Sequence, residues 1–149
     1  VLKMSGNTLG MAEALTAARK TKNVTLKVEA LQALPEATKQ HLHGIFMLAY
    51  NPKISWLLPP GIPPYKPLDP DTDSEGRLID EIKNFGYFIA MDGKPVQPNA
   101  QQMRREQLFV QILESVEPAD AELMLQMKDR EIKGVSKSVV AKAFPELGL

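Results

Sequence analysis

The chain has 149 residues, 44% of them hydrophobic, which is the usual size of one domain with its own core. It contains no cysteine, so disulfides, thiolate zinc sites and cysteine nucleophiles are excluded, and no apolar run is long enough to span a membrane. Lys and Arg equal Asp and Glu at 18 each, yet residues 1–57 carry seven basic and only three acidic side chains. This N-terminal excess favours an anionic partner, although nucleic-acid binders usually show a basic total.

Helical periodicity dominates the first part of the chain. We expect helices over residues 8–20, 24–34 and 36–50. The β-branched start of the second segment also fits a strand, and we favour the helix. The third segment ends before Asn51-Pro52, because a residue that precedes proline is pushed out of the helical region. It carries one apolar stripe, formed by Leu42, Ile45, Phe46 and Ala49.

A proline-rich loop follows, over residues 57–76. Six prolines within residues 59–70 prevent regular hydrogen-bonded structure and favour a stiff, extended crossing. Four acidic residues near its end alternate as in a calcium-binding loop: Asp69, Asp71, Asp73 and Glu75. No reading frame supplies both the glycine and the final carboxylate that such a loop requires. We therefore expect a solvated acidic turn and no metal site.

The second half predicts four more helices. They begin at Arg77, at Asn99, at Pro118 and after Ser136, and residues 91–98 are expected to form a loop from their turn chemistry. Pro118 suits a first helical position, and Ser136 is a typical N-cap. The sequence thus predicts an all-α fold: one compact domain over residues 1–149, with about seven helices and one proline-rich crossing loop.

The corner before the last helix is the sharpest local feature, within residues 128–144. Gly134 allows close approach of a backbone, Ser136 and Ser138 add hydroxyl donors, and Lys133 and Lys137 add positive charge beside a helix N-terminus. Such a corner can bind a phosphate. An ordinary capped turn is the alternative, and local sequence alone favours that alternative.

Residues 129–136, Asp-Arg-Glu-Ile-Lys-Gly-Val-Ser, resemble the end of the N-terminal DNA-binding domain of ATP-dependent DNA ligases. The likeness is closest to ligases of T-even-type bacteriophages, with a motif one residue longer here. Trp56 followed by a Pro-Pro-Gly loop also matches, and the order of helices agrees over most of residues 9–147. The resemblance implies that duplex DNA is held across its minor groove by phosphate contacts, without base reading. The implied contact residues are Lys133, Gly134, Val135, Ser136, Lys137 and Ser138.

Catalytic groups are not apparent in the sequence. The Lys-x-Asp-Gly motif with which ligases attack ATP is absent, and no nucleophile–base pair stands out. His41 and His43, two positions apart on a helix, point about 200° from each other and cannot easily share a metal.

We therefore expect a non-catalytic phage protein of the host cytoplasm that binds duplex DNA and needs no cofactor or small-molecule substrate. The alternative is an adaptor for a host or phage protein, such as a polymerase or replication component. A third, less favoured reading is a fragment of a full ligase. The adaptor would use the extended loop and its aromatic neighbours, Trp56, Pro60, Pro63 and Tyr65.

Overall fold

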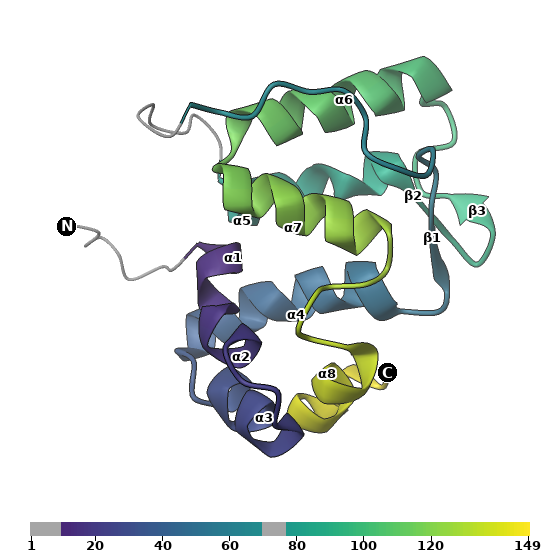
Figure 1. Cartoon of the computed structure of the whole chain (residues 1–149). Coiled ribbons are helices and arrows are strands. Elements are labelled where there is room, and N and C mark those ends of the chain that lie inside the picture. The colour runs from purple at the N-terminus through teal and green to yellow at the C-terminus, as the bar shows by residue number, and fades with distance from the viewer. Residues whose placement is uncertain (1–9, 70–76) are drawn as a thin grey trace.

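A computed structural model describes residues 10–69 and 77–149 (Figure 1). Within these residues, the 3-10 helices η2 (Ile82–Phe88) and η3 (Pro145–Leu147) and the short strands β1 (Ile54–Trp56), β2 (Ile89–Met91) and β3 (Lys94–Pro95) accompany the α-helices. The α-helices are α1 (Met11–Ala14), α2 (Thr16–Arg19), α3 (Val24–Gln32), α4 (Glu36–Tyr50), α5 (Leu78–Glu81), α6 (Gln102–Ser115), α7 (Pro118–Lys128) and α8 (Lys137–Ala143).

Helix α7 occupies the middle of the molecule. It packs between α4 and α6 and also contacts α1, while α3 packs against α8 at the lower end (Figure 1). The predicted apolar stripe of α4 is confirmed, since all four of its residues are fully buried. The described helices bury their apolar faces in a shared core. None of them is long and apolar enough to cross a bilayer.

The all-α prediction is wrong in one respect, because the fold contains a small antiparallel sheet of order β1-β2-β3. Trp56 in β1 pairs with Ile89 in β2, and Ala90 pairs with Pro95 in β3. Residues 91–98, predicted as a loop, thus include the turn and the second strand of a hairpin that begins with β2. Its two turn residues, Asp92 and Gly93, have φ values of 52° and 82°. This is the backbone form that best joins two twisted strands, and Asp-Gly is its typical sequence.

Two predicted helices are shorter than expected. The segment 8–20 forms α1 and α2, which are separated at Leu15, where ψ is −5°; residues 8 and 9 lie outside the described part. The segment that starts near Arg77 forms α5 and then η2. Phe85 and Phe88 in η2 are both buried, and a spacing of three aligns side chains on one face of a 3-10 helix.

The described part of the proline-rich loop, residues 57–69, runs beside α6 (Figure 1). Residues 57–69 contain no helix or strand, as the prolines predict, and the Lys66 amide donates to the Glu114 carboxylate of α6 at 2.8 Å. Most of the acidic turn, including Asp71, Asp73 and Glu75, lies outside the described residues.

Helix α1 is capped by a residue that is distant in sequence. Gly10, at the N-cap position, has no side chain that could accept a hydrogen bond from the first amides. The Ala12 amide donates instead to the carboxylate of Asp120 in α7, at 2.9 Å. Asp120 is only 7% exposed, and this burial raises the pKa of its carboxyl group. The nearby carboxylates of Glu117 and Glu13 raise this pKa further, while the Ala12 amide opposes the shift.

We predict that Asp120 makes the protein less stable as pH rises. Because the folded-state pKa is raised, the folded state binds the proton more tightly. That stabilisation is complete below the unfolded-state pKa and is lost as pH rises through the folded-state pKa. Asp120→Asn keeps an oxygen acceptor and should remove this dependence, whereas Asp120→Ala should cost about 1–2 kcal/mol. Urea unfolding from acidic to neutral pH measures the effect, and equal slopes for wild type and Asp120→Asn would contradict it.

Candidate functional site

The candidate corner begins where α7 ends. The Glu131 amide donates to the Gln126 carbonyl and the Arg130 amide to the Met127 carbonyl, both at 3.0 Å. This pair of bonds is a Schellman motif, in which the first residue after the cap adopts a left-handed conformation. Arg130 fills that position with φ of 61°, although glycine is the residue that adopts it without strain. Helix α7 therefore ends at Lys128, six residues before Gly134.

The Arg130 side chain joins the corner to the end of α4. Its guanidinium donates to the Ile54 carbonyl at 2.8 Å and to the Asn51 carbonyl at 2.5 Å. Burial lowers the pKa of this guanidinium, which nevertheless stays charged because arginine titrates far above neutrality. Arg130 thus ties the backbone that follows α4 to the turn that follows α7.

Tyr50, the last residue of α4, holds the next part of the corner. Its hydroxyl donates to the Val135 carbonyl at 2.6 Å and accepts from the Ile132 amide at 2.9 Å, and both bonds are buried. Burial is the main cause that raises the pKa of the Tyr50 phenol, so the hydroxyl keeps its proton at neutral pH. One side chain therefore fixes both ends of the segment from Ile132 to Val135.

Side chains from the N-terminal helices cover the middle of that segment. The Arg19 Nε donates to the Lys133 carbonyl at 2.9 Å, and the Lys27 Nζ donates to the Gly134 carbonyl at 2.6 Å. Gly134 has φ of 80°, and a Cβ placed there would lie 2.8 Å from the Cγ of Arg19. The group that approaches Gly134 closely is the Arg19 side chain, whereas the sequence predicted the approach of a backbone.

Most of the predicted phosphate contacts lie at the surface. Val135 is the exception: it is fully buried, and its amide donates to the Ile132 carbonyl, so its role is in packing. The Lys133 amide is also occupied, by Gln126 Oε1 at 3.1 Å, but the Lys133 side chain is exposed. Five predicted residues are exposed: Lys133, Gly134, Ser136, Lys137 and Ser138.

The predicted cap of the last helix is confirmed. The Ser136 Oγ accepts from the Val139 amide at 3.4 Å and also lies 3.1 Å from the Ser138 Oγ. The first amides of a helix have no acceptor within that helix. A bound anion could therefore accept hydrogen bonds from amides at the start of α8. Val135 and Val140, on either side of this cap, are both fully buried.

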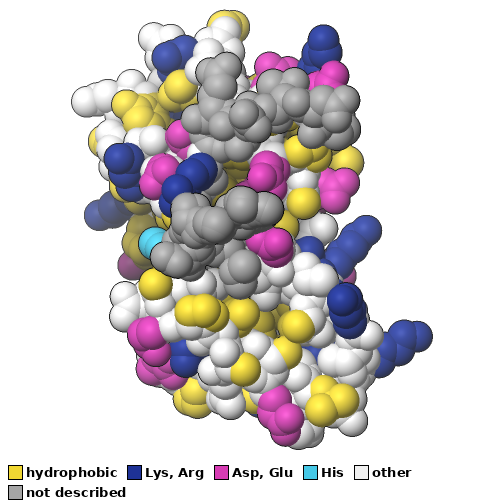
Figure 2. Space-filling view, turned by 90° about the vertical axis from the view of Figure 1, so that its left-hand side faces the viewer, with side chains coloured by type: hydrophobic (Ala, Val, Ile, Leu, Met, Phe, Trp, Pro, Cys, Tyr) yellow, Lys and Arg dark blue, Asp and Glu magenta, His cyan; other side chains and the backbone are white. Residues whose placement is uncertain are grey.

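Six cations from two distant parts of the sequence form what we call the cationic corner. Arg19 and Lys27 contact the corner directly, and the exposed Lys20 and Lys22 follow Arg19 in the chain. Lys and Arg side chains gather along the lower right-hand edge of Figure 2, in the half of the molecule that contains α2, α3 and α8. The cationic corner comprises Arg19, Lys20, Lys22, Lys27, Lys133 and Lys137.

Two acidic side chains, Glu122 and Glu131, lie near the cationic corner. Burial lowers the pKa of Arg19, an effect that the nearby Glu122 carboxylate partly opposes. Glu131, beside the corner, is close enough to raise the pKa of Tyr50. The sequence indicated the basic excess of residues 1–57, but it held no signal that this excess would meet Lys133 and Lys137.

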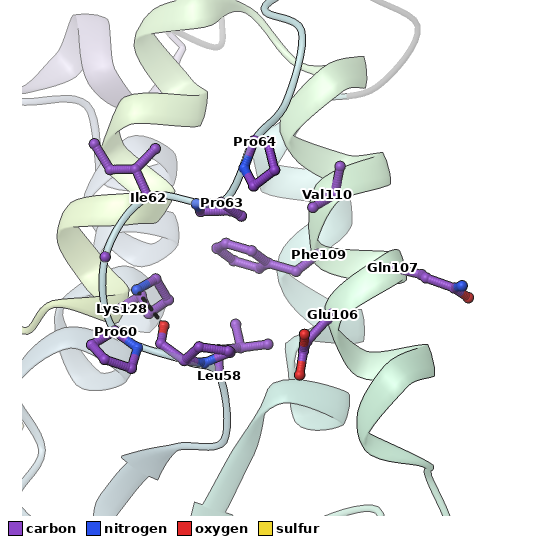
Figure 3. Close-up of a pocket in the computed structure, with 12 residues that line it drawn as sticks. Leu58, Pro60, Ile62, Pro63, Pro64, Glu106, Gln107, Phe109, Val110 and Lys128 are labelled. Carbon is purple, nitrogen blue, oxygen red and sulfur yellow. Dashed lines mark hydrogen bonds between the residues drawn. The ribbon is translucent and has the colours of Figure 1, made fainter.

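The aromatic residues expected to dock a partner protein are turned inward. The Trp56 indole donates to the Leu48 carbonyl at 3.0 Å and meets the Phe85 ring edge-on, with centroids 6.0 Å apart. Tyr65 is half-buried against the core. Both rings thus pack against the core, as a stiff crossing would place them, and each stays partly exposed. Pro60 and Pro63 instead line a pocket (Figure 3).

The two histidines take different positions on α4. His41 is exposed, while the His43 ring packs edge-on against Phe144, with centroids 4.8 Å apart. In residues 10–69 and 77–149, no three His, Asp or Glu side chains gather where they could hold a metal ion.

We predict that Tyr50→Phe lowers the free energy of unfolding by about 1–3 kcal/mol, because it leaves a buried amide and a buried carbonyl without their shared partner. Tyr87→Phe is the matched control, since the Tyr87 side chain is exposed and lies outside the corner. Urea unfolding measures both variants. A Tyr50→Phe protein as stable as Tyr87→Phe would contradict the role assigned to the hydroxyl.

Comparison with known proteins gives one match. Residues 14–134 match a family model described as a family of unknown function, DUF6433. No curated protein and no solved structure matches the chain. Because the match covers most of the sequence, the protein belongs to the DUF6433 family.

Proposed function

We propose that this protein is a non-catalytic module that holds duplex DNA through its phosphates. The observation that carries the proposal is the cationic corner, where the basic N-terminal segment meets Lys133 and Lys137. Arg19 and Lys27 reach the corner across more than a hundred residues of sequence, which concentrates positive charge on a chain of zero net charge. Local concentration of charge attracts a polyanion even when the total is neutral.

The cations of this corner divide into two groups with different roles. Lys20, Lys22, Lys133 and Lys137 are exposed, so their ammonium groups are free to follow a phosphate backbone. Arg19 and Lys27 are half-buried and tied to backbone carbonyls. They would hold the surface rigid and add to its potential, while the exposed lysines make the contacts.

The composition of the surface favours binding without base reading. The planar groups of Arg, Asn and Gln can each pair with two atoms of one base, which suits them to base reading. Here Arg19 is bound to the Lys133 carbonyl and to Gln126, and Asn23 caps α3 by accepting from the Leu26 amide at 3.1 Å. The exposed groups that remain at the corner are chiefly lysines and serines, which bind phosphates.

The resemblance to the DNA-gripping domain of phage ligases supports the same surface. The motif that carries it, residues 129–136, forms the turn between α7 and α8. A DNA grip without nucleotidyl transfer would suit a phage protein that acts on DNA in the host cytoplasm.

We predict that a random-sequence duplex binds with an affinity that falls steeply with salt, because each neutralised phosphate releases counterions. Fluorescence anisotropy at low and moderate salt measures the slope of log affinity against log salt. Absence of binding even at low salt would overturn the proposal and leave the protein adaptor as the better function.

The second prediction concerns the two exposed lysines beside α8. Lys133→Glu together with Lys137→Glu should weaken duplex binding and reduce the salt slope by about two, because two phosphate contacts are lost. Stability should change by no more than roughly half a kcal/mol per site, since both side chains are exposed.

Two controls make this test specific. Lys53→Glu with Lys94→Glu makes the same charge change at exposed positions beside the sheet, and it should leave most of the affinity intact. Val135→Asp places a carboxylate in the core and should lower the melting temperature. If both double variants weaken binding equally, the effect reflects net charge and the corner is not the DNA site.

A further inference from the structure

A pocket of about 370 Å³ lies between the proline-rich loop and α6 (Figure 3). Residues 58–64 form one wall, Val110 belongs to the opposite wall, and the Phe109 ring projects between them. This volume lies within the range of small-molecule sites, which combine apolar walls with a few polar groups. Here the charged groups are the ammonium of Lys128 and the carboxylate of Glu106, while the Gln107 amide, also in the lining, points away from the pocket (Figure 3).

Lys128 holds the loop in place. Its side chain is only 3% exposed, and its Nζ donates to the Pro59 carbonyl at 3.0 Å and to the Asp129 carboxylate at 3.2 Å. The positive charge is therefore already balanced by Asp129. Prolines fix the backbone on the same wall, so the pocket is formed before any ligand arrives.

Glu106 lies across the pocket from Lys128 (Figure 3). Its Oε2 accepts from the neutral amide of Gln102 at 3.0 Å, and the described residues place no Lys or Arg in an ion pair with it. A carboxylate beside apolar walls attracts a positive charge more strongly than one in open water. The uncompensated charge of the pocket is thus a single negative one.

We propose that this pocket binds a small organic monocation with an apolar body. The ammonium or guanidinium group of the ligand pairs with Glu106, and the hydrocarbon or aromatic body packs against Phe109 and the prolyl wall. The site is separate from the cationic corner, so its ligand and duplex DNA occupy different surfaces. Its test does not depend on the result of the DNA experiments.

The test compares probes that differ mainly in charge. Protein-observed NMR titration with 2-phenylethylamine and with its neutral analogue 2-phenylethanol gives two dissociation constants. We expect the amine to bind roughly tenfold more tightly, the usual effect of a hydrogen bond to a charged group, and to weaken as salt rises. Shifted signals should lie in residues 58–64 and α6. Equal affinities, or shifts confined elsewhere, would overturn the proposal.

Variants then assign the charge to Glu106. Glu106→Gln should lower amine affinity to that of the alcohol and leave the alcohol unchanged. Glu29→Gln makes the same charge change at an exposed position of α3 and should leave both affinities unchanged. An unaltered amine affinity in Glu106→Gln would overturn the proposal. Tighter binding of N-acetyl-lysine amide than of phenylethylamine would also overturn it. The occupant would then be a lysine of a protein segment and not a small molecule.

Discussion

The hydroxyl of Tyr50 is the contact on which the rest of the candidate site depends. It binds the Ile132 amide and the Val135 carbonyl at once, and so fixes the corner relative to α4. Arg130 fastens the preceding turn to the carbonyls of Asn51 and Ile54. The segment that follows α4 and the segment that follows α7 are thus tied together by side chains that bind backbone groups across the gap between them.

This mutual arrangement creates the surface that α2 and α3 complete. The carbonyls of Lys133 and Gly134 point outward from the fixed segment and accept from Arg19 and Lys27. The cations of the corner thus have two sources. Arg19 and Lys27 are held there by hydrogen bonds to its backbone, while Lys133 and Lys137 belong to its own sequence. In this way the protein gathers cations on one surface although its net charge is zero. The acidic excess lies elsewhere in the sequence, in residues 58–100, with seven acids and four bases.

The elements predicted correctly are those with local signals. The stripe of α4 repeats at helical spacing, Pro118 begins α7, and Ser136 caps α8, and each is decided by a few neighbouring residues. The hairpin had such a signal in Asp92-Gly93, but β2 and β3 are so short that no alternating pattern accompanies it. The Schellman turn was missed because Arg130 occupies a position where glycine is expected.

The candidate site was predictable only in part. Its lysines and serines stand together in the sequence, so the motif could be found. The contributions of Tyr50, Arg19 and Lys27 arise from tertiary contacts across 82 to 114 positions, and no local pattern encodes them. Burial of Val135 follows from the same contacts, because the hydroxyl that binds its carbonyl also draws the segment against the core.

A duplex titration of the isotopically labelled protein, followed by amide chemical shifts, tests the central claim most directly. If tertiary contacts assemble one DNA-binding surface, residues 19–22 and residues 133–138 should shift together at the same DNA concentration. The signals of α6 and the hairpin should stay unchanged. Shifts confined to α6 and the hairpin, or shifts in the corner without residues 19–22, would contradict the account.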